Sequence, residues 1–417
     1  MDIQEIFKSR VRTLALTEPD KCFSNMVFGY NAFHFYTKHF PKKHIAKGYA
    51  RLEELMMRTV AKGLKDPENL ILGSIYLPGE ITEAMGLRTL SLETLASYMA
   101  HGYNMEKILI NEAENRGVAS SLCSYHKAFL GAAFLDLLPE MRGCAGTSLA
   151  CDGNLLTLRA LHQNKKVPFY YLDVPQVMEE ASVKYLADQL RAFTAYLTEI
   201  TGKPFSLEKL QESVFYANET HKELLKFFRY SRDHIYPGEL IHQMYMMLAV
   251  HMLAGSRDLY ELIKFMNAEI QTMPPVTGKK ILWVHVVPFY QETLKKTFNA
   301  SKDYGFLASD IICDYLFDMD PEKPFESIAR RMIGHAFNGT MSNKVEILEG
   351  LSERYAPDGI INFCHWGCKQ AFGGSGILKA ADIGGVPFLN LDGDGIDARN
   401  SHDGQLKTRL EAFLEIV

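Results

Sequence analysis

Cysteine is the residue type in this sequence with the widest choice of chemistry. The seven cysteines are Cys22, Cys123, Cys144, Cys151, Cys313, Cys364 and Cys368. An odd number of cysteines in a chain of 417 residues argues against a disulfide framework. The roles that remain for these cysteines are buried apolar packing, nucleophilic catalysis and metal binding. Since no Cys-x-x-Cys pair occurs, zinc-ribbon and thioredoxin-like sites are disfavoured.

Two of the cysteines occupy matching places in a quasi-repeat. Cys151 follows a predicted strand over 147–150 and precedes a helical stretch and a Val-Pro-Phe strand that starts at Val167. Cys368 follows a predicted strand over 359–363 and precedes the same succession, with its Val-Pro-Phe at Val386. Each block reads strand, cysteine, helix, strand, which predicts parallel sheets with a cysteine at a strand's carboxyl end. Ligands of open α/β sheets bind at that edge.

A third cysteine, Cys123, directly precedes another predicted helix. The N–H groups at a helix N-terminus favour a thiolate, and thiolates bind soft metals. A buried free cysteine is the alternative interpretation of each position taken alone. Three widely spaced thiolates together suit an iron–sulfur cluster that leaves one iron open.

The other four cysteines, and two nearby histidines, are predicted not to be ligands. Cys364 falls inside a predicted strand, Cys144 in a predicted loop, and Cys22 and Cys313 stand alone as structural residues. The histidines are His126 and His365, for which hydrogen bonding is the expected role.

The elements that must position these residues form an α/β protein with two Rossmann- or flavodoxin-like parallel-sheet domains and a helical domain. The expected order is an N-terminal helical segment over 1–70, a first α/β domain over 71–176, a helical domain over 177–278 and a second α/β domain over 279–417. In the helical domain, one amphipathic helix ends at Gly202 and the next is capped by Ser206.

Charge and hydropathy exclude several classes of partner. Lys plus Arg total 45 against 50 for Asp plus Glu, a net charge of −5, so we expect no nucleic-acid partner. No run of about 18 apolar residues predicts a membrane span, and acids near the start do not fit a secretory signal. We expect a cytoplasmic protein. P-loop, dinucleotide-fingerprint, nucleophile-elbow and HExxH motifs are all absent.

From about residue 74 onward the chain resembles the 2-hydroxyacyl-CoA dehydratase and benzoyl-CoA reductase family, in particular the longer subunit of 2-hydroxyisocaproyl-CoA-type dehydratases. The resemblance is carried by the order and spacing of Tyr-Leu-Pro-Gly-Glu at 76–80, Leu-Cys-Ser-Tyr at 122–125, Cys151 with its Val-Pro-Phe strand, Cys-Lys at 368–369, and the acidic loop over 391–399. Residues 1–70 match the family poorly.

The resemblance implies a [4Fe-4S] cluster held by Cys123, Cys151 and Cys368, with the fourth iron open. It also implies a heterodimer with a homologous second subunit, and a separate ATP-dependent iron–sulfur activator that supplies one electron. The reaction implied is loss of water from a 2-hydroxyacyl-CoA to give a 2-enoyl-CoA, through a ketyl radical.

Two further residues are implicated by the same resemblance. Ser74 matches the position that approaches the open iron, and Glu93 matches a substrate-side carboxylate suited to proton transfer. An exposed acid at a helix start is the alternative interpretation of Glu93. The acidic loop is expected to hydrogen-bond the substrate or the partner. Two other functions stay open: a subunit of a benzoyl-CoA-type reductase, and a non-catalytic subunit that relays electrons or completes the dimer.

Overall fold

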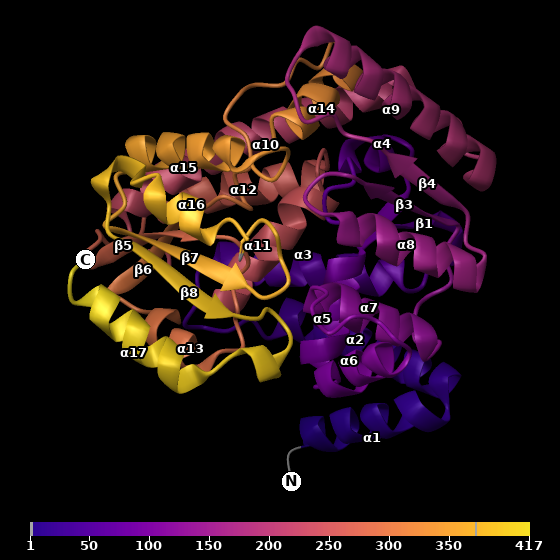
Figure 1. The fold of residues 1–417 in the computed structure, drawn as a ribbon, viewed down its shortest axis with the longest axis horizontal. Helices are drawn as coiled ribbons and strands as arrows, with labels where there is room; N and C mark the ends of the chain where they lie inside the picture. The colour runs from indigo at the N-terminus through magenta and orange to yellow at the C-terminus, as the bar shows by residue number, and fades with distance from the viewer. Residues whose placement is uncertain (1–2, 372) are drawn as a thin grey trace.

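The computed structural model describes residues 3–371 and 373–417 and contains two four-stranded, all-parallel sheets (Figure 1). The first sheet has the order β2-β1-β3-β4, with β1 Leu70–Gly73, β2 Arg88–Ser91, β3 Gly143–Thr147 and β4 Phe169–Leu172. The second has the order β6-β5-β7-β8, with β5 Lys279–Val284, β6 Tyr304–Ser309, β7 Gly359–His365 and β8 Phe388–Gly393. The two halves repeat one topology, which confirms the predicted fold class.

The inner strands are buried on both faces, as parallel strands covered by helices must be. Every residue of β7 is buried, and so is every residue of β5 after Lys279. Strand β3 corrects the prediction, because it spans Gly143–Thr147 rather than 147–150 and contains Cys144. Its small residues give a weak strand signal, and hydrogen bonding to β1 on one side and β4 on the other decides the conformation.

Seventeen α-helices surround the sheets within the described residues. The N-terminal helices are α1 Ile3–Thr17, α2 Pro19–His39 and α3 Lys47–Gly63. Around the first sheet lie α4 Gly79–Ala84, α5 Leu92–Gly102, α6 Glu106–Asn115, α7 Ser124–Phe134 and α8 Asp152–Lys165. Next come α9 Glu180–Thr201, α10 Leu207–Asp233, α11 Leu240–Met252 and α12 Arg257–Ile270. The last are α13 Glu292–Phe298, α14 Pro324–Ile333, α15 Met341–Tyr355, α16 Ser375–Ala380 and α17 Asp403–Leu414.

The end of α9 and the start of α10 lie where the sequence predicts. Gly202 ends α9 with a φ of 70°, a conformation that glycine adopts without steric cost. The Ser206 hydroxyl caps α10 by accepting a hydrogen bond from the Lys209 N–H. Helix α9 packs on α14, which belongs to the second half of the chain. The domain boundaries themselves stay a prediction.

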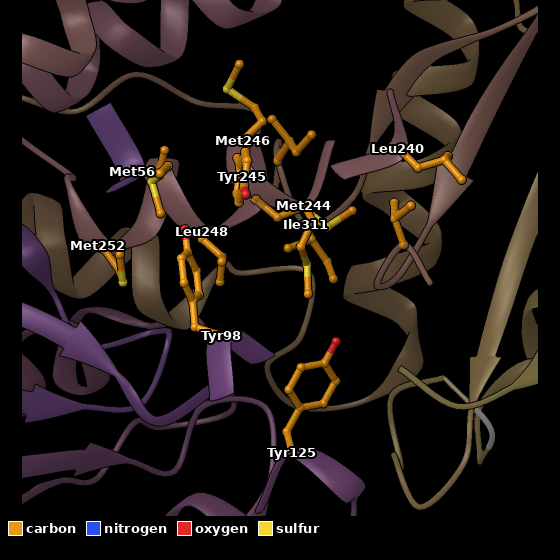
Figure 2. Packing of buried hydrophobic residues seen from close by; sticks show 14 of the residues in the cluster. Met56, Tyr98, Tyr125, Leu240, Met244, Tyr245, Met246, Leu248, Met252 and Ile311 are labelled. Atoms are coloured by element: carbon orange, nitrogen blue, oxygen red, sulfur yellow. The ribbon is translucent and has the colours of Figure 1, made fainter. Parts of the chain in front are cut away.

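Helix α11 is buried and rich in methionine. Met244, Met246 and Met252 are almost inaccessible, and Figure 2 shows them near Met56 of α3 and Tyr98 of α5. Flexible thioether side chains fill irregular gaps of this kind between helices. Within the described residues, no helix combines the length and the apolar character that a membrane crossing needs.

The α6–α7 contact places the start of α7, and it tolerates no side chain at Gly131. A Cβ atom there would lie 1.8 Å from the carbonyl oxygen of Leu109. We expect Gly131→Ala to lower the free energy of unfolding by about 2–3 kcal/mol or more, because backbone must move. Gly376→Ala is the matched control, since nothing lies within 4 Å of a Cβ in α16. Urea unfolding should show the control unchanged or up to about 1 kcal/mol more stable; equal effects would contradict the tight contact.

Candidate active site at the strand ends

Ser74 and Glu93 meet at the carboxyl ends of the first two strands. Gly73 of β1 is paired with Ser91 of β2, so the residues that follow both strands emerge at one edge. Ser91 caps α5 by accepting the N–H of Thr94, which sets Glu93 in the first helical turn. The Glu93 carboxylate then accepts the N–H of Ile75 at 3.0 Å. The two sequence-predicted residues are therefore neighbours.

The Glu93 carboxyl is held in surroundings that favour its neutral form. Burial raises the pKa of Glu93 to about 7, although hydrogen bonds from backbone and Ser91 act in the opposite direction. Glu93 is half-buried rather than an exposed acid at a helix start. A carboxyl with a pKa near neutrality is suited both to accept and to donate a proton.

Two buried hydroxyls near Glu93 have no hydrogen-bond partner in the described residues. They are Ser74 Oγ and the phenol oxygen of Tyr125, and both residues are less than 5% exposed. Burial raises the pKa of Tyr125, and the nearby charges of Cys123 and Glu93 raise it further. Buried hydroxyls without partners are costly, so they mark a place where a bound molecule can complete the hydrogen bonding.

The second sheet brings Cys368 beside Cys123. Gly367 has a φ of 75°, and a Cβ on it would lie 2.9 Å from the backbone nitrogen of Cys123. The turn after β7 therefore lies directly against the start of α7. In Figure 1 the arrowheads of β7 and β8 point toward the half of the molecule that contains the first sheet. Cys123 immediately precedes α7, as predicted.

Cys151 approaches the same place from the first sheet, immediately before α8. Burial raises the pKa of Cys151 to about 12, and the charge of Cys368 raises it further. Burial also raises the pKa of Cys123, and the nearby charges of Cys368 and Cys151 raise it further. These mutual effects show that the three thiols are close enough to interact. They are half-buried, whereas the other four cysteines are fully buried.

The expectation that helix N-termini would hold these cysteines as thiolates is wrong for the free thiols. Backbone N–H groups do lower the pKa of Cys151, but burial has the larger effect. After Cys368, moreover, the next helix begins only at Ser375. Loss of hydration therefore outweighs the backbone N–H groups at the helix start.

Each of the three thiols faces its own histidine, an arrangement that the sequence analysis did not find. The Sγ–Nε2 distances are 3.1 Å from Cys123 to His365, 3.6 Å from Cys151 to His126, and 3.3 Å from Cys368 to His285. Burial lowers the pKa of all three histidines, so they are neutral at pH 7. His285 was missed because its partner is 83 positions away in the sequence.

For His365, the hydrogen bonds show which ring nitrogen carries the proton. Its Nδ1 accepts the N–H of Gly395 at 2.9 Å, so the proton of the neutral ring is on Nε2, which faces Cys123. Gly395 is held in the turn after β8 by Asp394, whose carboxylate also accepts the Ser124 hydroxyl and the N–H groups of Ile396 and Asp397. The Asp394 carboxylate is thus used inside the protein, and the Asp397 carboxylate pairs with the guanidinium of Arg399; a binding role for the rest of the acidic loop stays a prediction.

A buried ion pair supports the third histidine. Lys344 Nζ lies 3.0 Å from Asp310 Oδ2, and both side chains are fully buried. Asp310 also accepts the backbone N–H of His285, which has a φ of 74°. A non-glycine residue in this conformation needs such support. The pair therefore fixes the imidazole that faces Cys368.

No group of three or more His, Cys, Asp or Glu residues in the described parts of the chain is arranged to hold a single metal ion. The cysteines expected to be structural are buried: Cys22 in α2, Cys313 after β6 and Cys364 in β7.

Comparison with known proteins gives a match over most of the chain. Residues 74–417 match the family described as 2-hydroxyglutaryl-CoA dehydratase, D-component. The chain belongs to this family. The matched part of this D-component protein starts at Ser74, directly after β1, and includes β2 to β8, whereas α1, α2, α3 and β1 precede it.

Three relatives of this D-component protein are alpha subunits of dehydratases. The lactoyl-CoA dehydratase subunit alpha of Anaerotignum propionicum is 24% identical over 382 residues, with 82% of this chain and 88% of the relative covered. The (R)-phenyllactyl-CoA dehydratase alpha subunit of Clostridium sporogenes is 21% identical, with 82% and 87% covered. The alpha subunit of (R)-2-hydroxyglutaryl-CoA dehydratase from Acidaminococcus fermentans is 23% identical, with 60% and 55% covered.

The pKa of Glu93 predicts a pH-dependent stability difference. With a pKa of about 7 in the folded chain and an ordinary value of 4.5, the folded state keeps a proton that the unfolded state releases between these pH values. Wild type therefore loses stability as pH rises through this window, and Glu93→Gln does not have this loss. In urea unfolding, the free energy of unfolding of the variant relative to that of wild type should increase by up to about 3 kcal/mol between pH 4.5 and pH 8. A difference that is constant with pH would contradict the burial of this carboxyl.

Proposed function

We propose that this chain is the iron–sulfur subunit of a radical 2-hydroxyacyl-CoA dehydratase, which converts a 2-hydroxyacyl-CoA to a 2-enoyl-CoA by loss of water. The observation that carries the proposal is the convergence of Cys123, Cys151 and Cys368, half-buried, beside Glu93 and the unpartnered hydroxyl of Ser74. The dehydratase names of all three relatives favour this reaction over reduction of an aromatic acyl-CoA. Within the family, we place the chain with the longer subunit of 2-hydroxyisocaproyl-CoA-type enzymes.

The donor set fits a [4Fe-4S] cluster better than a single ion. Thiols from three separated segments can each bind a different iron, whereas no group of three or more His, Cys, Asp or Glu among the described residues is arranged around a single ion. When bound, such a cluster would supply a low-potential electron and an open iron with Lewis-acid character toward a thioester carbonyl. The three imidazole N–H groups can donate to the sulfurs, and hydrogen bonds of this kind raise a cluster's reduction potential.

The protein side chains supply proton transfer and orientation. Glu93, at a pKa of about 7, can accept a proton from the acyl chain and return one to the departing hydroxyl. The hydroxyls of Ser74 and Tyr125 are free to donate hydrogen bonds to substrate oxygens. Because these groups are fixed before substrate binds, little reorganisation is needed at the reacting atoms. A chain that only relayed electrons would not need a carboxyl so tuned.

The proposal includes partners. The relatives are alpha subunits, which supports a homologous second subunit and a heterodimer. An ATP-dependent iron–sulfur activator would deliver the electron, and the acyl-CoA would be the substrate.

Cluster binding is tested with two cysteine variants. Anaerobically purified wild type should be brown and contain iron and acid-labile sulfide in equal amounts, and Cys151→Ala should lose both the visible absorption and the iron. Cys144→Ala is the matched control, because Cys144 is a fully buried thiol of β3 in the same sheet. Colourless wild type without iron, or equal iron in both variants, would contradict the proposal.

The role of Glu93 is tested by turnover. We expect Glu93→Gln to lower kcat by about 10²–10⁴-fold with the partner subunit and activator present, since a proton-transfer group is removed. Iron content and visible absorption should stay at the wild-type level. Normal turnover in this variant would exclude Glu93 as the proton-transfer group, and loss of iron would show a structural role.

A further inference from the structure

A second cavity is lined by residues of α1, α2, α5 and α11. The cavity has a volume of about 590 Å³, within the range of small-molecule sites. Its wall is largely aromatic and includes Phe7, Tyr30, Tyr98 and Phe289. Figure 2 shows Tyr98 beside Leu248 and Tyr245, which also line the cavity.

About half of this wall precedes the residues that match the family. Phe7, Phe28, Phe33 and Met57 all lie before Ser74, where the match begins. The aromatic hairpin of α1 and α2 therefore gives the cavity a shape that belongs to this chain and is not fixed by the matched core.

Residues of the cavity wall lie on the same helix as Glu93. Ser97 and His101 line the cavity, and they follow Glu93 at intervals of four residues, so the three share one helix face. Each interval is a rise of about 6 Å. A group bound in the cavity thus begins about one helical turn from the carboxyl proposed to transfer a proton.

The cavity wall offers little charge to hold an ion. Lys8 is the one Lys, Arg, Asp or Glu among the described lining residues. His101 is neutral at pH 7, because burial lowers its pKa to about 4, and its Nε2 lies 3.1 Å from the carbonyl oxygen of Gly395. Apart from Lys8, the described wall therefore has no cation to compensate a carboxylate or a diphosphate for its lost hydration.

Two hydroxyls of the wall have no hydrogen-bond partner within the described residues. They belong to Tyr30 and Tyr98, both more than nine-tenths buried, with ring centroids 5.8 Å apart. Both phenol oxygens are themselves fully buried, so the wall presents mainly apolar surface to a ligand.

We propose that this cavity binds the side chain of the acyl group, and that the substrate's acyl group is bulky, uncharged and largely apolar, such as an aryl-substituted propanoyl group. The inference rests on the proposed function, because it takes the reacting carbons to lie at Glu93. It goes beyond that function by excluding small and anionic acyl groups as the preferred substrates. The CoA moiety, with its phosphates, would lie outside the cavity.

Binding of three unreactive esters tests the inference on the anaerobically purified complex of this chain with its partner subunit. The probes are 3-phenylpropanoyl-CoA, propanoyl-CoA and glutaryl-CoA, which lack the 2-hydroxyl group and cannot be dehydrated. We expect the Kd of the phenylpropanoyl ester, measured by calorimetry, to be at least tenfold lower than those of the other two.

Two tryptophan variants of α2 localise the effect. Ala32 lines the cavity and is exposed, so Ala32→Trp should fill the space without disturbing the fold. It should raise the Kd of the phenylpropanoyl ester at least tenfold and leave that of propanoyl-CoA unchanged. Ser24→Trp, at an exposed position of the same helix outside the cavity, is the control and should change neither.

Other outcomes overturn the inference in distinguishable ways. Equal affinities for the three esters, or no effect of Ala32→Trp on any Kd, would show that the cavity does not bind the acyl side chain. The proposed function would not be affected by that result. Weaker association of the two subunits in Ala32→Trp, with unchanged ester affinities, would assign the cavity to the partner subunit instead. If wild type binds none of the esters and contains no iron, the proposed function itself fails.

Discussion

The contact between the turn after β7 and the start of α7 is the constraint on which the candidate site depends. Gly367 packs backbone against backbone with Cys123, at a distance that excludes any Cβ atom. This contact joins the carboxyl edges of two sheets that are far apart in the sequence. Without it, Cys368 would belong to one half of the molecule, and Cys123 and Cys151 to the other. A strand-end edge is where open α/β sheets bind ligands, and here two such edges share one site.

Burial at this junction determines the chemistry of each ionisable group. It raises the pKa of the thiols and of Glu93 and lowers that of the histidines, so the free site is largely uncharged near pH 7. An uncharged, partly dehydrated site strengthens any electrostatic interaction with a bound group. Fixed imidazoles then act as oriented donors, and the fully buried pair of Lys344 and Asp310 holds the one nearest Cys368.

The N-terminal helices add a second cavity to the topology of two repeated sheets. They cover α5 and α11 with aromatic side chains and line this cavity together with α5, the helix that carries Glu93. Because the matched family residues begin only at Ser74, about half of the wall of the proposed acyl pocket precedes them, whereas the residues proposed for the reaction all lie within them.

The sequence by itself determined the features that are local along the chain. The repeated order of strand, cysteine, helix and Val-Pro-Phe strand predicted two parallel sheets, and Gly202 and Ser206 marked helix ends correctly. These signals depend on neighbours within a few residues, where periodicity and capping act. The strand at Gly143–Thr147 was misplaced for the same reason, because its small residues become a strand only through pairing on both sides.

Only the tertiary structure decided which side chains face the thiols and where a ligand can enter. The pairing of Cys368 with His285, and of Cys123 with His365, joins residues 83 and 242 positions apart. The unpartnered hydroxyls of Ser74 and Tyr125, and the cavity under the N-terminal hairpin, likewise arise where separate segments pack together. No spacing along the chain encodes such contacts, since they depend on how the two sheets and the helices between them are packed.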